Sequence, residues 1–298
     1  MGRGSYTSAD WTRLKKSASI TTEASVSQIF KRRSMDDKFN PVFIEKRESR
    51  DSDDHPDSTP IIIGLDVTGS MGYLSENIAK NSLNEVMMKL YSTNMVKDPQ
   101  ILFAAVGDVK DNAPLQVTQF ESDIRIAEQL LELWLEFGGK DAPEDYELLW
   151  YFAARHTMAD AFEKGRKGFL FTIGDADIHS KLDGGDVTRI FGDSRECFSS
   201  RELYNMASKN YEIFHIQIIK ESSVKMTEFT KIMPGRIVPV DKANINRLPE
   251  IIISIMQIAN GEDKERVLEQ WDELAKPIVN NALSKLVIRN QKKREFFF

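Results

Sequence analysis

Residues 61–72 read Ile-Ile-Ile-Gly-Leu-Asp-Val-Thr-Gly-Ser-Met-Gly, an apolar run that ends in an acid, two hydroxyl side chains and two glycines. The run is rich in β-branched residues and far shorter than the ~20 residues of a membrane-spanning helix, so it predicts a buried strand of a parallel sheet. In open α/β sheets, ligands bind at the carboxyl ends of the strands. Asp66, Thr68 and Ser70 stand at that end and supply the oxygen atoms that a hard divalent cation prefers. This stretch therefore predicts half of a metal site.

Apolar runs alternate with helical patterns along the rest of the chain. Beyond the first strand, we expect buried strands at 101–107, 168–173, 213–219 and 237–240, an edge strand at 115–120, and helices at 78–90, 124–137, 146–162, 201–208 and 248–258. Such alternation predicts an α/β fold with a doubly wound, mainly parallel sheet and right-handed crossovers. In this topology Asp66, Asp108, Asp141 and Asp175 emerge at one edge of the sheet.

Three segments resemble, in the right order, the motifs of von Willebrand factor A (vWA) domains. The pattern Asp-x-Thr-x-Ser at 66–70 is similar to their metal-ion-dependent adhesion site. A Gly-rich turn at 137–144 follows some seventy residues later, and the strand within 168–177 ends in Gly-Asp, the reverse of the commonest order. The resemblance covers residues 58–260 and implies a Rossmann-like vWA fold of the intracellular type.

The resemblance also implies a ligand set and a metal. The implied ion is Mg²⁺, with Ca²⁺ or Mn²⁺ as alternatives, and its implied ligands are Asp66, Thr68, Ser70, Asp141 and Asp175. Asp141 stands where family members carry a hydroxyl, and Glu144 and Asp145 are close enough to take its place. A third carboxylate would neutralise more of the charge of the cation, so we expect tighter metal binding and weaker attraction of an acidic partner.

A second interpretation of the same residues needs no metal. Asp66 could cap the following helix, and Thr68 and Ser70 could bond to the backbone of the turn, as such residues commonly do. The expected convergence of four carboxylates at one edge favours the cation, because these charges would otherwise repel each other.

Length and composition indicate one domain with extensions. The chain has 298 residues, of which 41% are hydrophobic, enough for one sizeable core. We expect an N-terminal arm and linker at 1–57, a vWA-like domain at 58–260, and a C-terminal helix with a basic, Phe-rich tail at 261–298. Self-association through the arm and tail is a further expectation.

Charge and cysteine content narrow the class of protein. The net charge is −6, and residues 1–50 carry 11 Lys and Arg against 6 Asp and Glu, so the acidic excess lies in the remainder of the chain. An acidic body argues against a nucleic-acid binder, because affinity for nucleic acid comes from neutralising phosphates. Cys197 is the only cysteine, and residues 1–20 lack the apolar segment of a signal peptide. We therefore expect a soluble, cytoplasmic protein without a membrane partner.

The favoured function is metal-dependent binding of a protein partner, as an adaptor or assembly factor in an intracellular complex. One alternative is a structural subunit of a phage or other large assembly that uses arm and tail contacts. Another is a serine hydrolase, because Ser70 lies in part of a Gly-x-Ser-x-Gly pattern, with His179 or His215 as the base. Ser70 follows the first core strand, whereas such a serine normally follows several strands, so we expect no enzyme.

Overall fold

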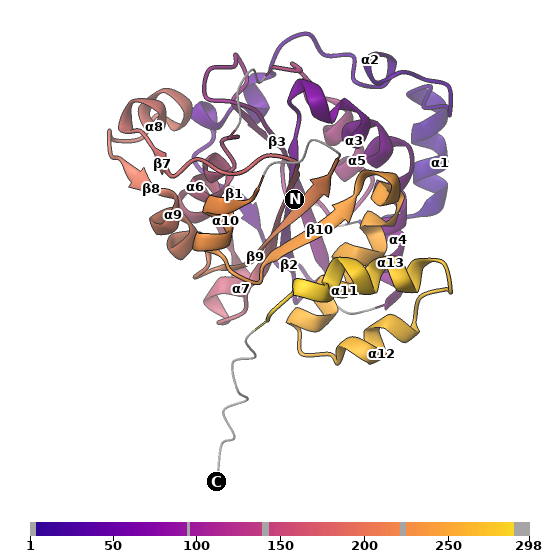
Figure 1. Ribbon diagram of the computed structural model, residues 1–298. Helices are drawn as coiled ribbons and strands as arrows, with labels where there is room; N and C mark the ends of the chain where they lie inside the picture. Colours follow the sequence, from indigo (N-terminus) through magenta and orange to yellow (C-terminus); the bar gives the residue numbers. More distant parts are fainter. Residues whose placement is uncertain (1–3, 94–95, 139–142, 221–224, 289–298) are drawn as a thin grey trace.

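A six-stranded sheet forms the centre of the protein (Figure 1). The computed structural model describes residues 4–93, 96–138, 143–220 and 225–288. The strand order is β10-β9-β6-β2-β3-β4, with all neighbours parallel except β3 and β4, which are antiparallel. The strands are β2 (Thr59–Asp66), β3 (Pro99–Val106), β4 (Leu115–Val117), β6 (Gly168–Gly174), β9 (Tyr211–Ile219) and β10 (Ile237–Asp241). The predicted α/β fold with a mainly parallel, doubly wound sheet is confirmed.

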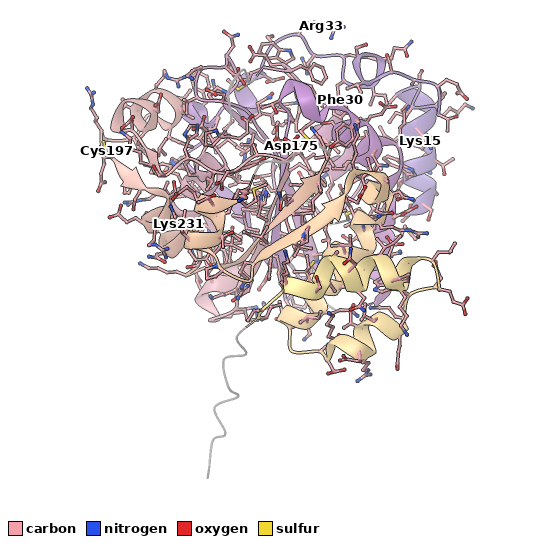
Figure 2. The ribbon with its side chains drawn as sticks, viewed as in Figure 1. Lys15, Phe30, Arg33, Asp175, Cys197 and Lys231 are labelled. Carbon is pink, nitrogen blue, oxygen red and sulfur yellow. The ribbon has the colours of Figure 1, made fainter. Side chains whose placement is uncertain are left out.

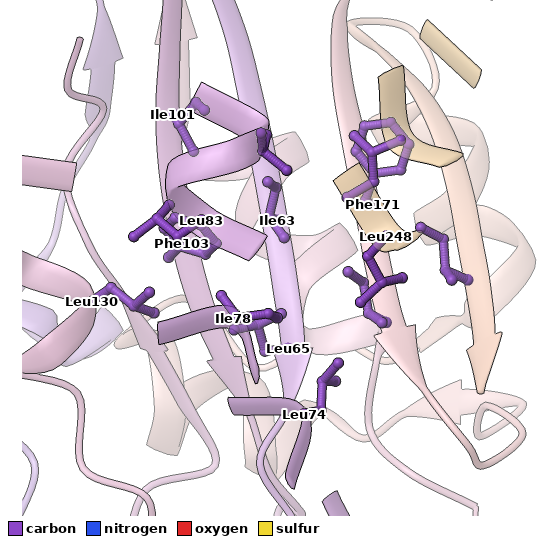
Figure 3. Close-up of a cluster of buried hydrophobic side chains, with 14 of the residues drawn as sticks. Ile63, Leu65, Leu74, Ile78, Leu83, Ile101, Phe103, Leu130, Phe171 and Leu248 are labelled. Carbon is purple, nitrogen blue, oxygen red and sulfur yellow. The ribbon is translucent and has the colours of Figure 1, made fainter. Parts of the chain in front are cut away.

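Helices cover both faces of this sheet. Strand β2 alternates between the two resulting cores, with Ile61, Ile63 and Leu65 in one and Ile62 in the other. Figure 3 shows the first core, where side chains of β2, β3 and β6 meet those of the helices. On this face lie α3 (Gly72–Asn77), α4 (Leu83–Thr93), α5 (Arg125–Leu131) and α11 (Leu248–Ala259); on the other lie α6 (Glu147–Arg155), α8 (Gly184–Phe191), α9 (Ser200–Ala207) and α10 (Thr227–Ile232). Burial on both faces explains why the central strands are continuous apolar runs.

Several helices differ from the predicted ranges. The helix predicted at 146–162 is broken into α6, the short strand β5 (Thr157–Ala159) and α7 (Asp160–Glu163). The break follows from pairing, because β5 forms a parallel ladder with β1 (Arg47–Ser49). The helix predicted at 78–90 begins earlier, with α3, and passes through a π-helical stretch at Ile78–Ser82 before α4. The helix predicted at 124–137 is shorter, since α5 ends at Leu131.

The segment before residue 58 wraps around the edge of the sheet that β4 forms. Helix α1 (Ser8–Ser17) buries Trp11, and Phe39 also lies in the core on the α4 face. Five residues later, Ile44 lies in the core on the α6 face. Where the segment crosses, the Arg47 guanidinium donates a hydrogen bond of 3.0 Å to the carbonyl oxygen of Val117 in β4. The segment thereby covers the edge strand, whose backbone would otherwise be available for pairing.

The C-terminal helices pack against α11. These are α12 (Lys264–Glu269) and α13 (Ala275–Ala282), which place Val267, Leu268 and Val279 in buried positions. The Trp271 indole N–H between them donates a 2.8 Å hydrogen bond to Ser254 on α11. Within the described part of the chain, none of the helices has both the length and the apolar character needed to cross a bilayer.

Candidate functional site

Asp66 ends β2 and is completely buried at the carboxyl edge of the sheet. Its Oδ1 accepts hydrogen bonds from the backbone N–H of Thr68 at 2.9 Å and from the Thr68 hydroxyl at 2.6 Å. Its Oδ2 accepts a hydrogen bond of 2.8 Å from the hydroxyl of Tyr146. Burial raises the pKa of Asp66 to about 6, although these three hydrogen bonds favour the charged form. Asp66 is thus a carboxylate held in one orientation but short of neutralising charge.

Gly174, at the end of the neighbouring strand β6, leaves the space that this arrangement needs. A Cβ at this position would lie 1.8 Å from the Tyr146 hydroxyl and 2.8 Å from Asp66 Oδ2. Only glycine therefore allows the Tyr146 hydroxyl to approach Asp66. This contact gives a physical reason for the Gly174-Asp175 order in the sequence.

The structure brings three of the five predicted ligands to one edge. Asp66 and Thr68 are in direct contact, and the charge of Asp175 contributes to the raised pKa of Asp66. Asp175 lies at the end of the sheet toward which the arrowheads of β9 and β10 point (Figures 1 and 2). The backbone of Ser70 lies in a 3₁₀ turn, Gly69–Met71, while its side chain is outside the described structure. Asp141 also lies outside the described residues.

Further acids surround Asp66. Glu144 is 7% exposed, and its Oε2 has no hydrogen-bond partner among the described residues. Burial, followed by the charges of Asp66, Asp108 and Asp145, raises the pKa of Glu144 to about 9. Burial is the largest cause of this raised pKa, and the contributions of four neighbouring acids to it indicate that negative charge is concentrated at this edge.

Part of the acidic cluster ties the loops of this edge together. Asp145 Oδ2 accepts a 2.7 Å hydrogen bond from the backbone N–H of Val109, and Asp108 Oδ1 accepts one of the same length from Lys110. Asp111 Oδ2 accepts a hydrogen bond of 3.0 Å from the backbone N–H of Asp108. These acids therefore hold the loop after β3 against the segment that leads into α6.

Two residues of the site were not predicted from the sequence. Tyr146 is completely buried and lies within an apolar helical pattern, so nothing local distinguishes it from a core aromatic residue. Glu147 is also completely buried, next to the carboxyl group of Asp145. Burial and then the charge of Asp145 raise the pKa of Glu147 well above its ordinary value. Glu147 is the first residue of α6, where an acid is common, so nothing in the sequence signalled its burial.

The oxygen atoms of this site suit a cation that is bound by only one or two carboxylates. Within the ranges that the structure describes, no group of three or more His, Cys, Asp or Glu side chains is arranged to hold a metal ion. The Asp66 carboxylate and the Thr68 hydroxyl, however, are 2.6 Å apart and offer only oxygen. Mg²⁺ is commonly bound through one or two carboxylates and keeps several waters. Among the described residues, the Asp66 carboxylate and the Thr68 hydroxyl therefore fit an ion whose other ligands include water.

The two histidines considered as bases have different surroundings. His215 in β9 is completely buried, its Nδ1 lies 2.9 Å from the Thr172 hydroxyl, and burial lowers its pKa to about 3. His179 is on the surface, with Nε2 3.8 Å from Asp145 Oδ1. His215 is therefore a neutral group of the sheet interior.

Comparison with known proteins gives matches among solved structures only. No model of a protein family matches the sequence, and no curated protein sequence matches it. Proximal thread matrix protein 1 from the mussel byssus has a TM-score of 0.46 and 9% identity, with 67% of this chain and 48% of that chain covered. Von Willebrand factor type A from Catenulispora acidiphila has a TM-score of 0.38 and 14% identity, with 68% of this chain and 42% of that chain covered. The vWA domain of SpRpn10 has a TM-score of 0.36 and 11% identity, with 61% of this chain and 87% of that chain covered.

This chain spans less than half of the length of the first two of these proteins. Its own architecture contains the parts that the sequence motifs led us to expect. These are a six-stranded sheet with one antiparallel edge strand, helices on both faces, and the Asp66–Thr68 turn at the carboxyl edge. The chain has a von Willebrand factor A-like fold.

Proposed function

We propose that the chain is a protein-binding module that holds a divalent cation at the carboxyl edge of its sheet and uses it to bind a partner. The cation is Mg²⁺, with Ca²⁺ or Mn²⁺ as alternatives. Asp66 and Thr68 hold it, and Ser70, Asp141 and Asp175 complete its surroundings directly or through water. The module acts as an adaptor or assembly factor in a complex inside the cell.

The observation that carries this proposal is the buried pair of Asp66 and the Thr68 hydroxyl. Burying a carboxylate is costly unless a positive charge or several hydrogen bonds compensate it. Asp66 has three hydrogen bonds, yet its pKa is raised to about 6, and Glu144 beside it stays protonated up to about pH 9. A divalent cation at Asp66 would lower the energy of every charged acid in the cluster.

Thermal unfolding with and without metal tests the cation. Because a ligand that binds only the native state stabilises it by RT ln(1 + [L]/Kd), a hundredfold excess of Mg²⁺ over Kd adds about 2.7 kcal/mol. We expect the protein to melt at a higher temperature in Mg²⁺ than in EDTA, and Asp66→Asn to lose this shift. Asp57→Asn, at the opposite edge of the sheet, is the matched control and should keep it. Wild-type melting curves that coincide in Mg²⁺ and EDTA would exclude the metal site.

The partner is tested with the same variants. Tagged wild-type protein incubated in a lysate of its source cells should retain a specific protein in Mg²⁺ and release it in EDTA. Asp66→Asn should not retain this protein, and Asp57→Asn should. Equal retention by the wild type and by Asp66→Asn would separate partner binding from the cation site and contradict the proposal.

We also propose that the chain is not a serine hydrolase. His215 is buried, neutral and in contact with Thr172, so it is not placed to serve as an accessible base. His179 faces a carboxylate of the acidic cluster. A fluorophosphonate probe should therefore leave the protein unlabelled. Labelling that disappears in Ser70→Ala would establish the hydrolase instead.

A further inference from the structure

Lys220 lies beside the candidate cation site. Asp175 directly follows β6, and Lys220 directly follows the adjacent parallel strand β9, so both emerge at the carboxyl edge. The Lys220 ammonium group forms an ion pair with Asp175 Oδ2. The two side chains are only 19% and 17% exposed, so this pair is less screened by water than an ordinary surface pair.

The ring of Tyr73 connects this ion pair to Asp66. Tyr73 lies on α3, immediately after the Asp66 turn, and the Lys220 Nζ is 5.6 Å from its ring centroid. Burial, and then the charges of Asp175 and Asp66, raise the pKa of Tyr73 above its ordinary value. The same ring accepts a second cation, because the Lys242 Nζ lies 4.1 Å from its centroid. The ammonium of Lys220 is thus held by Asp175 and by the ring, within electrostatic range of Asp66.

We propose that Lys220 is a built-in counter-ion of the cation site, which competes with the divalent cation for Asp175 and so sets the affinity of the site. This inference rests on the proposed function. A fixed positive charge next to a divalent cation opposes its binding, and a carboxylate that pairs with an ammonium group offers fewer lone pairs to a metal. In the metal-free protein, the same ammonium offsets part of the repulsion among the acids. Lys220 therefore stabilises the metal-free state and weakens metal binding.

The experiment compares the affinity for Mn²⁺ in full-length variants, measured by electron paramagnetic resonance of the free ion and by calorimetry with Mg²⁺. Lys220→Met removes the charge and keeps the apolar stem, and Lys220→Gln is a second variant in case the first does not fold. Lys242→Met is the matched control, because its described contact is with the same Tyr73 ring. We expect Lys220→Met to bind the ion at least tenfold more tightly and to melt at a lower temperature in EDTA. Lys242→Met should change Kd less than threefold.

The outcomes separate this inference from the proposed function. Tighter binding by Lys220→Met than by a wild type that also binds supports both. Binding that only this variant shows supports the role of Lys220 and overturns the proposed function of the wild type. Equal or weaker binding by both Lys220 variants, with a wild type that does bind, overturns the role of Lys220 and leaves the cation site in place. Absence of binding by the wild type and by every variant overturns both.

Discussion

The two ends of β2 carry the same kind of residue in opposite electrostatic surroundings. At the amino end, Asp57 lies 3.0 Å from the Lys97 ammonium and 3.4 Å from the Arg166 guanidinium, and the hydrogen bond from Lys97 is the main cause of its lowered pKa. At the carboxyl end, burial and neighbouring acids raise the pKa values of Asp66 and Glu144 to about 6 and about 9.

The acid at the amino end forms ion pairs with cations, whereas the acids at the carboxyl end are buried beside one another. At the amino end, the negative charge of Asp57 is paired with the cations of Lys97 and Arg166. At the carboxyl end, burial and repulsion make the metal-free fold less stable, and such strain is characteristic of sites that bind a ligand. This contrast supports the proposed cation site at the carboxyl edge of the sheet.

The largest change in the free energy of unfolding is expected when a methyl group is added at the carboxyl edge. Gly174→Ala places a Cβ 1.8 Å from the Tyr146 hydroxyl, so it should lower the free energy of unfolding by about 3 kcal/mol or more. Gly165→Ala at the amino end is the control, because its φ of +70° costs about 1 kcal/mol but no atom lies within 4 Å. Urea unfolding measures both. Equal losses would mean that the Tyr146–Asp66 contact is not tightly packed.

The next effect concerns His215, which burial alone keeps neutral in the middle of the sheet. Its pKa of about 3 in the folded state lies below the ordinary value of 6.5, so below pH 6.5 the unfolded state binds the proton more readily. The stability contributed by neutral His215 is complete above pH 6.5 and is lost toward pH 3, by up to about 1.4 kcal/mol per pH unit.

Replacing this histidine should flatten the acid branch of the stability curve. His215→Leu has similar volume and no proton to bind, so its free energy of unfolding should fall less between pH 6.5 and 4 than that of the wild type. Urea unfolding at a series of pH values measures the difference. Parallel curves would show that His215 is not kept neutral by burial.

The smallest expected change in stability comes from neutralising one acid at each edge of the sheet. Glu144 has a raised pKa in the folded state, so its contribution to stability is greatest below pH 4.5 and is lost as pH rises toward 9. In EDTA at pH 7, Glu144→Gln should therefore stabilise the protein by about 1–2 kcal/mol. Asp57→Asn at the amino end should have the opposite sign, because it removes ion pairs. Destabilisation by both variants would remove the electrostatic contrast between the two edges.

The sequence predicted the parts of the molecule that depend on local pattern. The apolar runs identified the five parallel strands of the central sheet, because a parallel strand buried on both faces has a continuous apolar sequence, and the alternating pattern at 115–120 identified the antiparallel edge strand β4. The Asp-x-Thr-x-Ser pattern brought Asp66 and Thr68 together correctly, since these residues belong to one turn.

Contacts between distant segments could not be predicted in this way. Tyr146 meets Asp66 across 80 residues of sequence, and the ladder between β1 and β5 joins segments more than 100 residues apart. Lys220 had no feature that marked it as a partner of Asp175. The predicted metal-binding roles of Asp66, Thr68, Ser70, Asp141 and Asp175 all stay predictions.

The wrapped N-terminal segment has a consequence for how the protein is made. It is synthesised before the central sheet, yet its Ile44 carbonyl accepts a hydrogen bond from His156, which is translated 112 residues later. At about 5–20 residues per second, the partner of Ile44 is made roughly 5–20 s after Ile44 itself. Docking of this segment should therefore be the last and slowest step of folding, with a rate limited by these distant contacts.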